Sequence, residues 1–114
     1  MSFIIEATDK SFHESVRARG ITFVDFGAAW CPPCKALAPM LDQLAGEWGE
    51  EVGIVKVDVE ASPETAARFK IMSMPTVLVF VDGQPVERLV GLRPKPLYSG
   101  VVGKYRNELL LRQH

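Results

Sequence analysis

The only two cysteines of the chain, Cys31 and Cys34, are three positions apart and follow an apolar, strand-like run. A disulfide between them would close a four-residue loop. The loop-entropy model gives such a loop only about 2 kcal/mol, against about 3 kcal/mol for a fifteen-residue loop. As a structural crosslink the pair contributes little. A reversible two-electron dithiol on a strand-to-helix turn is the chemistry that this spacing indicates.

The two sulfurs are expected to have different roles. Cys31 stands at the expected start of a helix, where unpaired N–H groups and the helix dipole stabilise a thiolate, so it is the better attacking sulfur. Cys34 lies one turn deeper, and we expect it to be more buried and to act as the resolving thiol. Pro32 and Pro33 suit a first helical turn but supply no N–H, so Cys31 depends on donors from Cys34 onward.

Asp25 is the second candidate for chemistry, because it lies within a run expected to be buried in a parallel sheet. Burial raises the pKa of a carboxyl group. A carboxyl group of raised pKa shortly before a dithiol can exchange a proton with the sulfur of Cys34. A structural role, with Asp25 partnered or reaching solvent at the strand end, explains the residue equally well.

Lys56 interrupts the apolar run of residues 52–59 and shares its strand parity with Ile54 and Asp58. It either leans toward Asp25 from a neighbouring strand or is a surface lysine paired with Asp58. The pattern alone favours the surface pair, since lysine is rarely buried without a partner.

The elements that must position these residues follow from periodicity and from cap and turn signals. Strands are expected at residues 3–5, 21–26, 52–59, 76–81 and 86–90, and helices at about 8–19, 32–48, 63–70 and 97–109. Two β-α-β crossovers imply a parallel portion, and the closing hairpin adds antiparallel strands. The prediction is an α/β fold in which helices flank both faces of a central, mixed five-stranded sheet, with residues 1–114 forming one domain.

Several classes of function are disfavoured. The net charge of −1 gives no reason to expect nucleic acid or an anionic membrane as a partner. A zinc site needs four ligands, and only His13 and His114 remain beside the cysteines, so no metal is expected. Residues 1–6 do not resemble a secretory signal, and the apolar stretch 77–81 is too short to span a bilayer. A cytoplasmic monomer is the expectation.

Taken in order, the motifs of the chain closely resemble those of the thioredoxin family over about residues 12–109. The resemblance rests on Val24-Asp25-Phe26, Trp30-Cys31-Pro32-Pro33-Cys34-Lys35, Ala38-Pro39, Val55-Lys56-Val57-Asp58, Met74-Pro75-Thr76, Asp82-Gly83 and Val90-Gly91. It implies the thioredoxin fold and reduction of protein disulfides through a redox-active Cys31–Cys34 pair without a further cofactor. Electrons would come from a separate NADPH-dependent thioredoxin reductase, because the chain has no nucleotide-binding fingerprint.

The resemblance also implies roles for single residues. Asp25 would be the buried proton-exchange group and Lys56 the neighbour that tunes it, while Pro75 would be cis and pack beside Cys31. An apolar collar would hold the cysteine segment of a partner, and the backbone of Met74 would bind that segment like an added strand. The residues of this collar would be Trp30, Val59, Ser73, Met74, Val90 and Gly91.

The chain departs from the family pattern at two positions. Pro32 stands where the most familiar members have glycine, which should shift the redox poise in a direction that sequence does not give. Gly27 stands where the family usually has tryptophan, which leaves room beside the dithiol. Two other functions remain open at this stage: a disulfide oxidase or isomerase of the same fold, and a binding or chaperone subunit without redox turnover.

Overall fold

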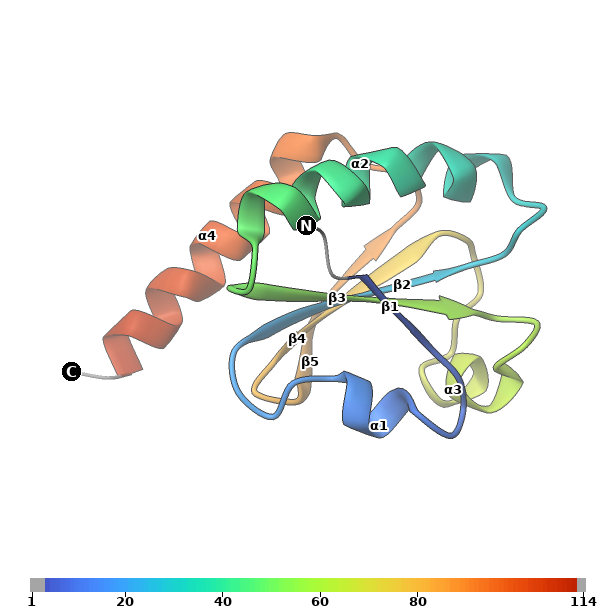
Figure 1. The fold of residues 1–114 in the computed structure, drawn as a ribbon, viewed down its shortest axis with the longest axis horizontal. Helices are drawn as coiled ribbons and strands as arrows, with labels where there is room; N and C mark the ends of the chain where they lie inside the picture. Colours follow the sequence, from blue (N-terminus) through green and yellow to red (C-terminus); the bar gives the residue numbers. More distant parts are fainter. Residues whose placement is uncertain (1–3, 113–114) are drawn as a thin grey trace.

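The computed structural model describes residues 4–112 and contains nine helices and strands in that range, drawn in Figure 1. Their order agrees with the one expected from sequence. In chain order they are β1 (Ile4–Ala7), α1 (Phe12–Ser15), β2 (Ile21–Gly27), α2 (Pro32–Trp48), β3 (Val52–Asp58), α3 (Pro63–Arg68), β4 (Thr76–Val81), β5 (Gln84–Val90) and α4 (Lys95–Arg112). Phe3, which the sequence places in the first strand, lies outside the described residues.

The strands form one mixed sheet in the order β1-β3-β2-β4-β5. β1 and β2 are parallel to β3, while β4 runs antiparallel to both β2 and β5. The carboxyl ends of β2 and β3 and the amino end of β4 therefore meet at one edge. There Gly27 pairs with Asp58, and Phe26 pairs with Thr76. This edge carries the dithiol.

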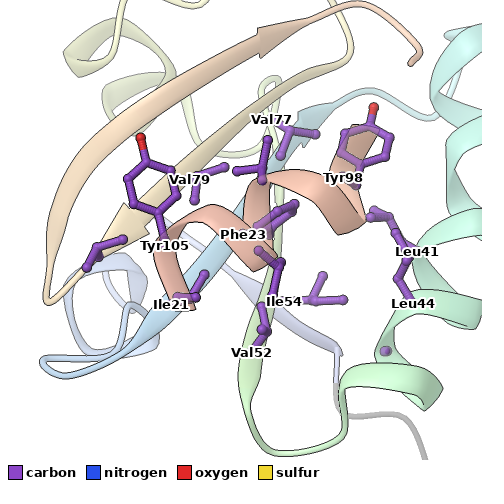
Figure 2. Packing of buried hydrophobic residues seen from close by; sticks show 14 of the residues in the cluster. Ile21, Phe23, Leu41, Leu44, Val52, Ile54, Val77, Val79, Tyr98 and Tyr105 are labelled. Atoms are coloured by element: carbon purple, nitrogen blue, oxygen red, sulfur yellow. The ribbon is translucent and has the colours of Figure 1, made fainter. Parts of the chain in front are cut away.

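Helices cover both faces of the sheet, with α2 and α4 on one side and α1 and α3 on the other (Figure 1). Alternation along β2 sends Phe23 to the α2 and α4 side and Val24 to the opposite core. Figure 2 shows Phe23 packed with Tyr98 of α4 and with Leu41 of α2. Because β2 is central and covered on both faces, Asp25 cannot turn away from the protein interior. The predicted α/β fold with a five-stranded mixed sheet is confirmed.

The first helix is much shorter than the sequence indicated. α1 ends at Ser15, and Val16 already has an extended backbone, with ψ of 125°. Instead of continuing the helix to residue 19, the chain packs onto the sheet. The Arg17 N–H donates to Thr22 Oγ1 at 3.2 Å, and the Arg17 guanidinium donates to the Glu50 carbonyl. Tertiary hydrogen bonds have replaced helical ones here.

The final helix was expected from leucine, valine and tyrosine positions repeating every four residues, beginning at Leu97. In the structure Leu97 is 38% exposed, whereas its neighbour Tyr98 is fully buried. A true helical period of 3.6 residues brings Tyr98, Val101 and Tyr105 onto the buried face. Within residues 4–112, no helix is both long and apolar enough to cross a membrane.

Candidate active site

The two cysteines form a disulfide at the amino end of α2, with their Cα atoms 5.2 Å apart. Cys31 is the N-cap of the helix, and the backbone N–H of Cys34 donates to Cys31 Sγ at 3.3 Å. Pro32 and Pro33 occupy the first two helical positions, which need no intrahelical N–H. The helix thus presents one backbone donor and its positive end to the Cys31 sulfur, which favours a thiolate there.

The expected order of burial of the two cysteines is wrong. Cys31 is only 4% exposed, whereas Cys34 is half-buried. The carbonyl of Met74 lies 3.7 Å from Cys31 Sγ and helps to cover it. Cys34 instead faces Gly27, which has no side chain, and a Cβ atom added at Gly27 would lie 3.2 Å from Cys34 Sγ. A side chain at position 27 would therefore lie against Cys34 Sγ and help to cover it.

The loop before β4 forms the other side of the disulfide. The Met74–Pro75 peptide bond is cis, as the resemblance implied, and Pro75 is buried. The Thr76 hydroxyl donates to the Ser73 carbonyl at 2.6 Å, and the Gly91 N–H donates to the Pro75 carbonyl at 2.8 Å. These bonds hold the Met74 carbonyl against Cys31.

Asp25 lies on the α2 side of the sheet and is 4% exposed. Burial raises its pKa from 3.8 to about 6, against the opposing positive charge of Lys56. Lys56 is half-buried and pairs with Asp25 in the strand register. Within the part of the chain that the structure describes, Lys56 forms no ion pair with Asp25, and the expected alternative, a pair with Asp58, is not formed either. Asp25 Oδ1 has no hydrogen-bond partner among the described residues.

A cavity of about 420 Å³ joins these groups. Its lining includes Asp25, Gly27, Cys34 and Lys56, together with Asp58 at the end of β3. Cys31 is not part of the lining. The buried carboxyl and the Cys34 sulfur thus border one space in which a proton can pass between them.

Only three of the six residues predicted to form the collar are exposed. Trp30 is 59% exposed and Val90 is 43% exposed, and Ser73 is also exposed. The other three predicted members, Val59, Met74 and Gly91, are half-buried.

Sequence reasoning missed three residues at this surface. Met72 is 91% exposed and precedes Ser73, and Leu92 is 42% exposed and follows Gly91. Their position next to predicted collar residues was the signal that could have identified them. Glu60 Oε1 accepts from Trp30 Nε1 at 2.7 Å. No local pattern links residues that are thirty positions apart, so the Glu60 contact had no signal in the sequence.

The thioredoxin family model matches residues 3–102 of the chain. The chain belongs to the thioredoxin family. It is 44% identical over 102 residues to a thioredoxin of Staphylococcus saprophyticus, which covers 90% of this chain and 97% of that protein. Thioredoxins of Staphylococcus haemolyticus and Staphylococcus aureus match with the same coverage at 45% and 44% identity.

Family membership and the Cys31–Cys34 disulfide together define the activity. The chain is a thiol–disulfide oxidoreductase of the thioredoxin family, a protein-disulfide reductase. Thioredoxins use a redox-active disulfide in place of a cofactor. Among residues 4–112, no group of three or more His, Cys, Asp or Glu side chains is arranged to hold a metal ion.

Proposed function

We propose that reduced Cys31 begins the reaction by attacking a disulfide in a partner protein. The attack forms a mixed disulfide and releases one partner sulfur as a thiolate. Cys34 then attacks Cys31 Sγ, which releases the second partner sulfur and leaves the Cys31–Cys34 disulfide. The observation that carries this assignment is the position of Cys31 Sγ at the N-terminus of α2, where it accepts the Cys34 N–H. That position stabilises the attacking thiolate.

Asp25 takes the proton from Cys34 as the resolving thiol becomes a nucleophile. Two features support this role: both groups border the same cavity, and Asp25 has a pKa of about 6, which lies near working pH. The charge of Lys56 keeps that pKa from rising further.

The partner segment lies on the collar formed by Trp30, Val59, Ser73, Met74, Val90 and Gly91. Exposed apolar side chains at Trp30 and Val90 support a contact of this kind. The backbone of Met74 hydrogen-bonds the segment as an added strand would, which brings its sulfur to Cys31. Specificity then rests on shape and main-chain contacts more than on charge.

Electrons reach the disulfide from an NADPH-dependent thioredoxin reductase, and residues 1–114 act as one monomeric domain in the cytoplasm. Pro32 and Pro33 set the reduction potential by stiffening the first turn of α2. Identity over nearly the whole length of bacterial thioredoxins supports the reductase partner and the cytoplasmic location.

An insulin-reduction assay tests this proposal. A bacterial thioredoxin reductase supplies the electrons, and the oxidation of NADPH is measured. Wild type should sustain NADPH oxidation, while Cys31→Ser and Cys34→Ser should each abolish it.

A redox titration against glutathione separates the reductase from an oxidase or isomerase. The glutathione pool of the cytosol has a reduction potential of roughly −220 to −260 mV when it is measured biochemically. A reduction potential of the Cys31–Cys34 pair clearly above that range would overturn the reductase assignment. A Cys31→Ser, Cys34→Ser double variant that retains function in a deletion strain would instead indicate a binding subunit.

A further inference from the structure

The edge of the sheet that carries the disulfide has charges of opposite sign at its two ends. Along this edge lie, in order, the end of β3, the end of β2, the start of β4 and the end of β5. Glu60 follows β3 and Arg93 follows β5, so the two residues stand at opposite ends. The disulfide follows β2, and the cis-Pro75 bond precedes β4, so both lie between the two charges.

Hydrogen bonds hold Glu60 in place at one end. Its Oε1 accepts from Trp30 Nε1 at 2.7 Å, and its backbone N–H donates to Asp58 Oδ1 at 2.8 Å. Glu60 is nevertheless exposed. Because a carboxylate can accept several hydrogen bonds, the bond from Trp30 leaves room for a donor from a partner. This end of the collar therefore presents a fixed negative charge.

The neighbouring cavity does not cancel the charge of Glu60. Besides the buried carboxyl group of β2, its charged lining residues are two cations, Lys35 and Lys56, and two carboxylates, Glu6 and Asp58. These four charges balance, and Glu60 does not belong to the lining. Glu60 therefore sets the sign at this end.

Arg93 is held in a similar way at the other end. Its backbone N–H donates to the Tyr98 hydroxyl at 3.3 Å, and its Nε donates to the Val90 carbonyl at 3.0 Å. Since Tyr98 is fully buried, the first bond ties the Arg93 backbone to the core. The exposed guanidinium has further N–H donors in a fork that fits a carboxylate. A fixed positive charge thus lies beside the collar residue Val90.

Both charges are available to one extended segment. Among residues 4–112, neither Glu60 nor Arg93 takes part in a salt bridge, whereas the nearby Lys95 is paired with Glu47. The two ends are three strand spacings apart, which is about 14 Å at about 4.8 Å each. An extended chain advances about 3.3 Å per residue, so side chains about four positions apart span this distance.

We propose that the collar prefers partner segments with opposite charges on the two sides of the reactive cysteine, a cation toward Glu60 and a carboxylate toward Arg93. In an extended segment, side chains about two positions before and after the cysteine point to the same face as its sulfur. This preference rests on the proposed binding of the partner segment to the collar. It adds selection by charge to a contact that shape and main-chain bonds govern.

Short peptides joined into dimers through a single cysteine disulfide test the preference. One peptide has lysine about two positions before the cysteine and glutamate about two positions after it, a second has the reverse order, and a third has glutamine at both positions. Pre-reduced protein is mixed with each dimer, and acid quenching with chromatography gives the second-order rate of reduction. At low salt one order should be reduced about threefold faster than the other or more. The difference should largely disappear at about 1 M salt, which screens exposed charges.

Variants assign each charge to its end, using peptides that carry only the carboxylate or only the cation of the favoured order. Arg93→Gln should remove the advantage of the carboxylate peptide over the neutral one, and Arg93→Lys should retain it. Glu60→Gln keeps an acceptor for Trp30 and should remove only the advantage of the cationic peptide. Arg19→Gln and Glu50→Gln are the matched controls and should keep both advantages, because both residues are exposed and precede β2 and β3 at the opposite edge of the sheet.

Equal rates for the two orders in wild type would overturn this inference, as would control variants that weaken the preference as much as Arg93→Gln does. The neutral dimer scores the proposed function separately. If wild type fails to reduce it, the collar mechanism is wrong and the charge preference fails with it. Reduction of the neutral dimer without a preference between the two orders would overturn the charge preference alone.

Discussion

Burial of the Asp25 carboxyl makes the stability of the protein depend on pH. The central strand holds its carboxyl at 4% exposure with Oδ1 unpartnered, so ionisation there is unfavourable and the pKa rises to about 6. Below the ordinary pKa of 3.8 the carboxyl is protonated in both the folded and unfolded chains, and there is no cost. As pH rises through about 6 the folded protein must carry a buried charge, and the destabilisation reaches its full value.

We therefore predict that Asp25→Asn stabilises the protein at neutral pH. A difference of one pKa unit corresponds to about 1.4 kcal/mol, so the free energy of unfolding at pH 8 should increase by about 2 to 3 kcal/mol. The gain should shrink toward zero near pH 4. If Asp25 accepts the Cys34 proton as proposed, the same variant should resolve mixed disulfides about tenfold more slowly or worse. Urea unfolding at several pH values and stopped-flow kinetics measure the two effects.

Asp42→Asn, at an exposed carboxylate on α2, serves as the control and should leave both quantities unchanged. A less stable Asp25→Asn protein, or one that resolves mixed disulfides at the wild-type rate, would show that Asp25 has a structural role only.

The cysteines show where sequence reasoning at the residue scale reaches its limit. The spacing of Cys31 and Cys34 was enough to indicate a dithiol, and the predicted start of the helix, which the structure places at Cys31, led to the prediction of which sulfur is activated. Their burial was not predictable, because it depends on the Met74 carbonyl, far away in sequence, and on the bare surface at Gly27. The sequence shows that position 27 lacks a tryptophan. It does not show that Cys34 lies next to this position, because that contact is known only from the folded structure.

At the scale of elements, most bounds were predicted within one or two residues, whereas α1 was predicted much too long. The bounds of α2 agree with the expected residues 32–48, because its proline start and its leucine period are local signals. α1 has only four residues, and contacts of Arg17 with β2 and with residue 50 decide where it ends. Short elements are set by such tertiary contacts more than by propensity.

Asp9 is a second example of a tertiary contact that local sequence does not reveal. It precedes α1 in the chain, but it caps the first turn of α3. Its carboxylate accepts from Thr65 Oγ1 at 2.6 Å, from the Thr65 N–H at 2.8 Å and from the Glu64 N–H at 3.3 Å. The bond from the Thr65 side chain is the main cause that lowers the pKa of Asp9. The segment before α1 is thereby joined to the first turn of α3.

We predict that Asp9→Ala lowers the free energy of unfolding, because it leaves the first turn of α3 without these acceptors. Since the folded pKa of Asp9 is lowered, its contribution is present above the ordinary pKa and is lost as pH falls through the folded value. The difference between Asp9→Ala and wild type should therefore shrink in acid. Urea midpoints measured at pH 7 and at pH 3 report it. Glu14→Ala, at an exposed acidic residue within α1, should match wild type; equal loss in both variants would rule out a specific cap.

At the scale of the whole molecule, the sheet order concentrates stability where the site needs rigidity. β2 and β3 are each paired on both sides, and β2 is buried along nearly its whole length. β1 and β5 form the edges, and most residues of β5 are exposed. The sequence predicted the number and type of these elements. The lateral position of β1 beside β3 was not assigned, because pairing across the sheet leaves no local signal.

Native-state hydrogen exchange should follow this arrangement. We predict that the amides of β2 and β3 exchange only through global unfolding, since they lie in the central, doubly paired part of the sheet. Amides of α1 and of the outer side of β5 should exchange through local openings of much lower free energy. Equal protection of β5 and β2 would contradict the central placement of β2.

The central claim is that Cys31 attacks protein disulfides and Cys34 resolves them. The most direct measurement mixes reduced Cys34→Ser and reduced Cys31→Ser separately with insulin and identifies covalent adducts by intact mass. Cys34→Ser should accumulate a stable mixed disulfide through Cys31, because no second thiol remains to release the partner. Cys31→Ser should form none, since Cys34 lies within α2 and lacks the N-cap position that activates Cys31. A stable insulin adduct on Cys34 in Cys31→Ser, with none on Cys31 in Cys34→Ser, would reverse the two roles and contradict the mechanism.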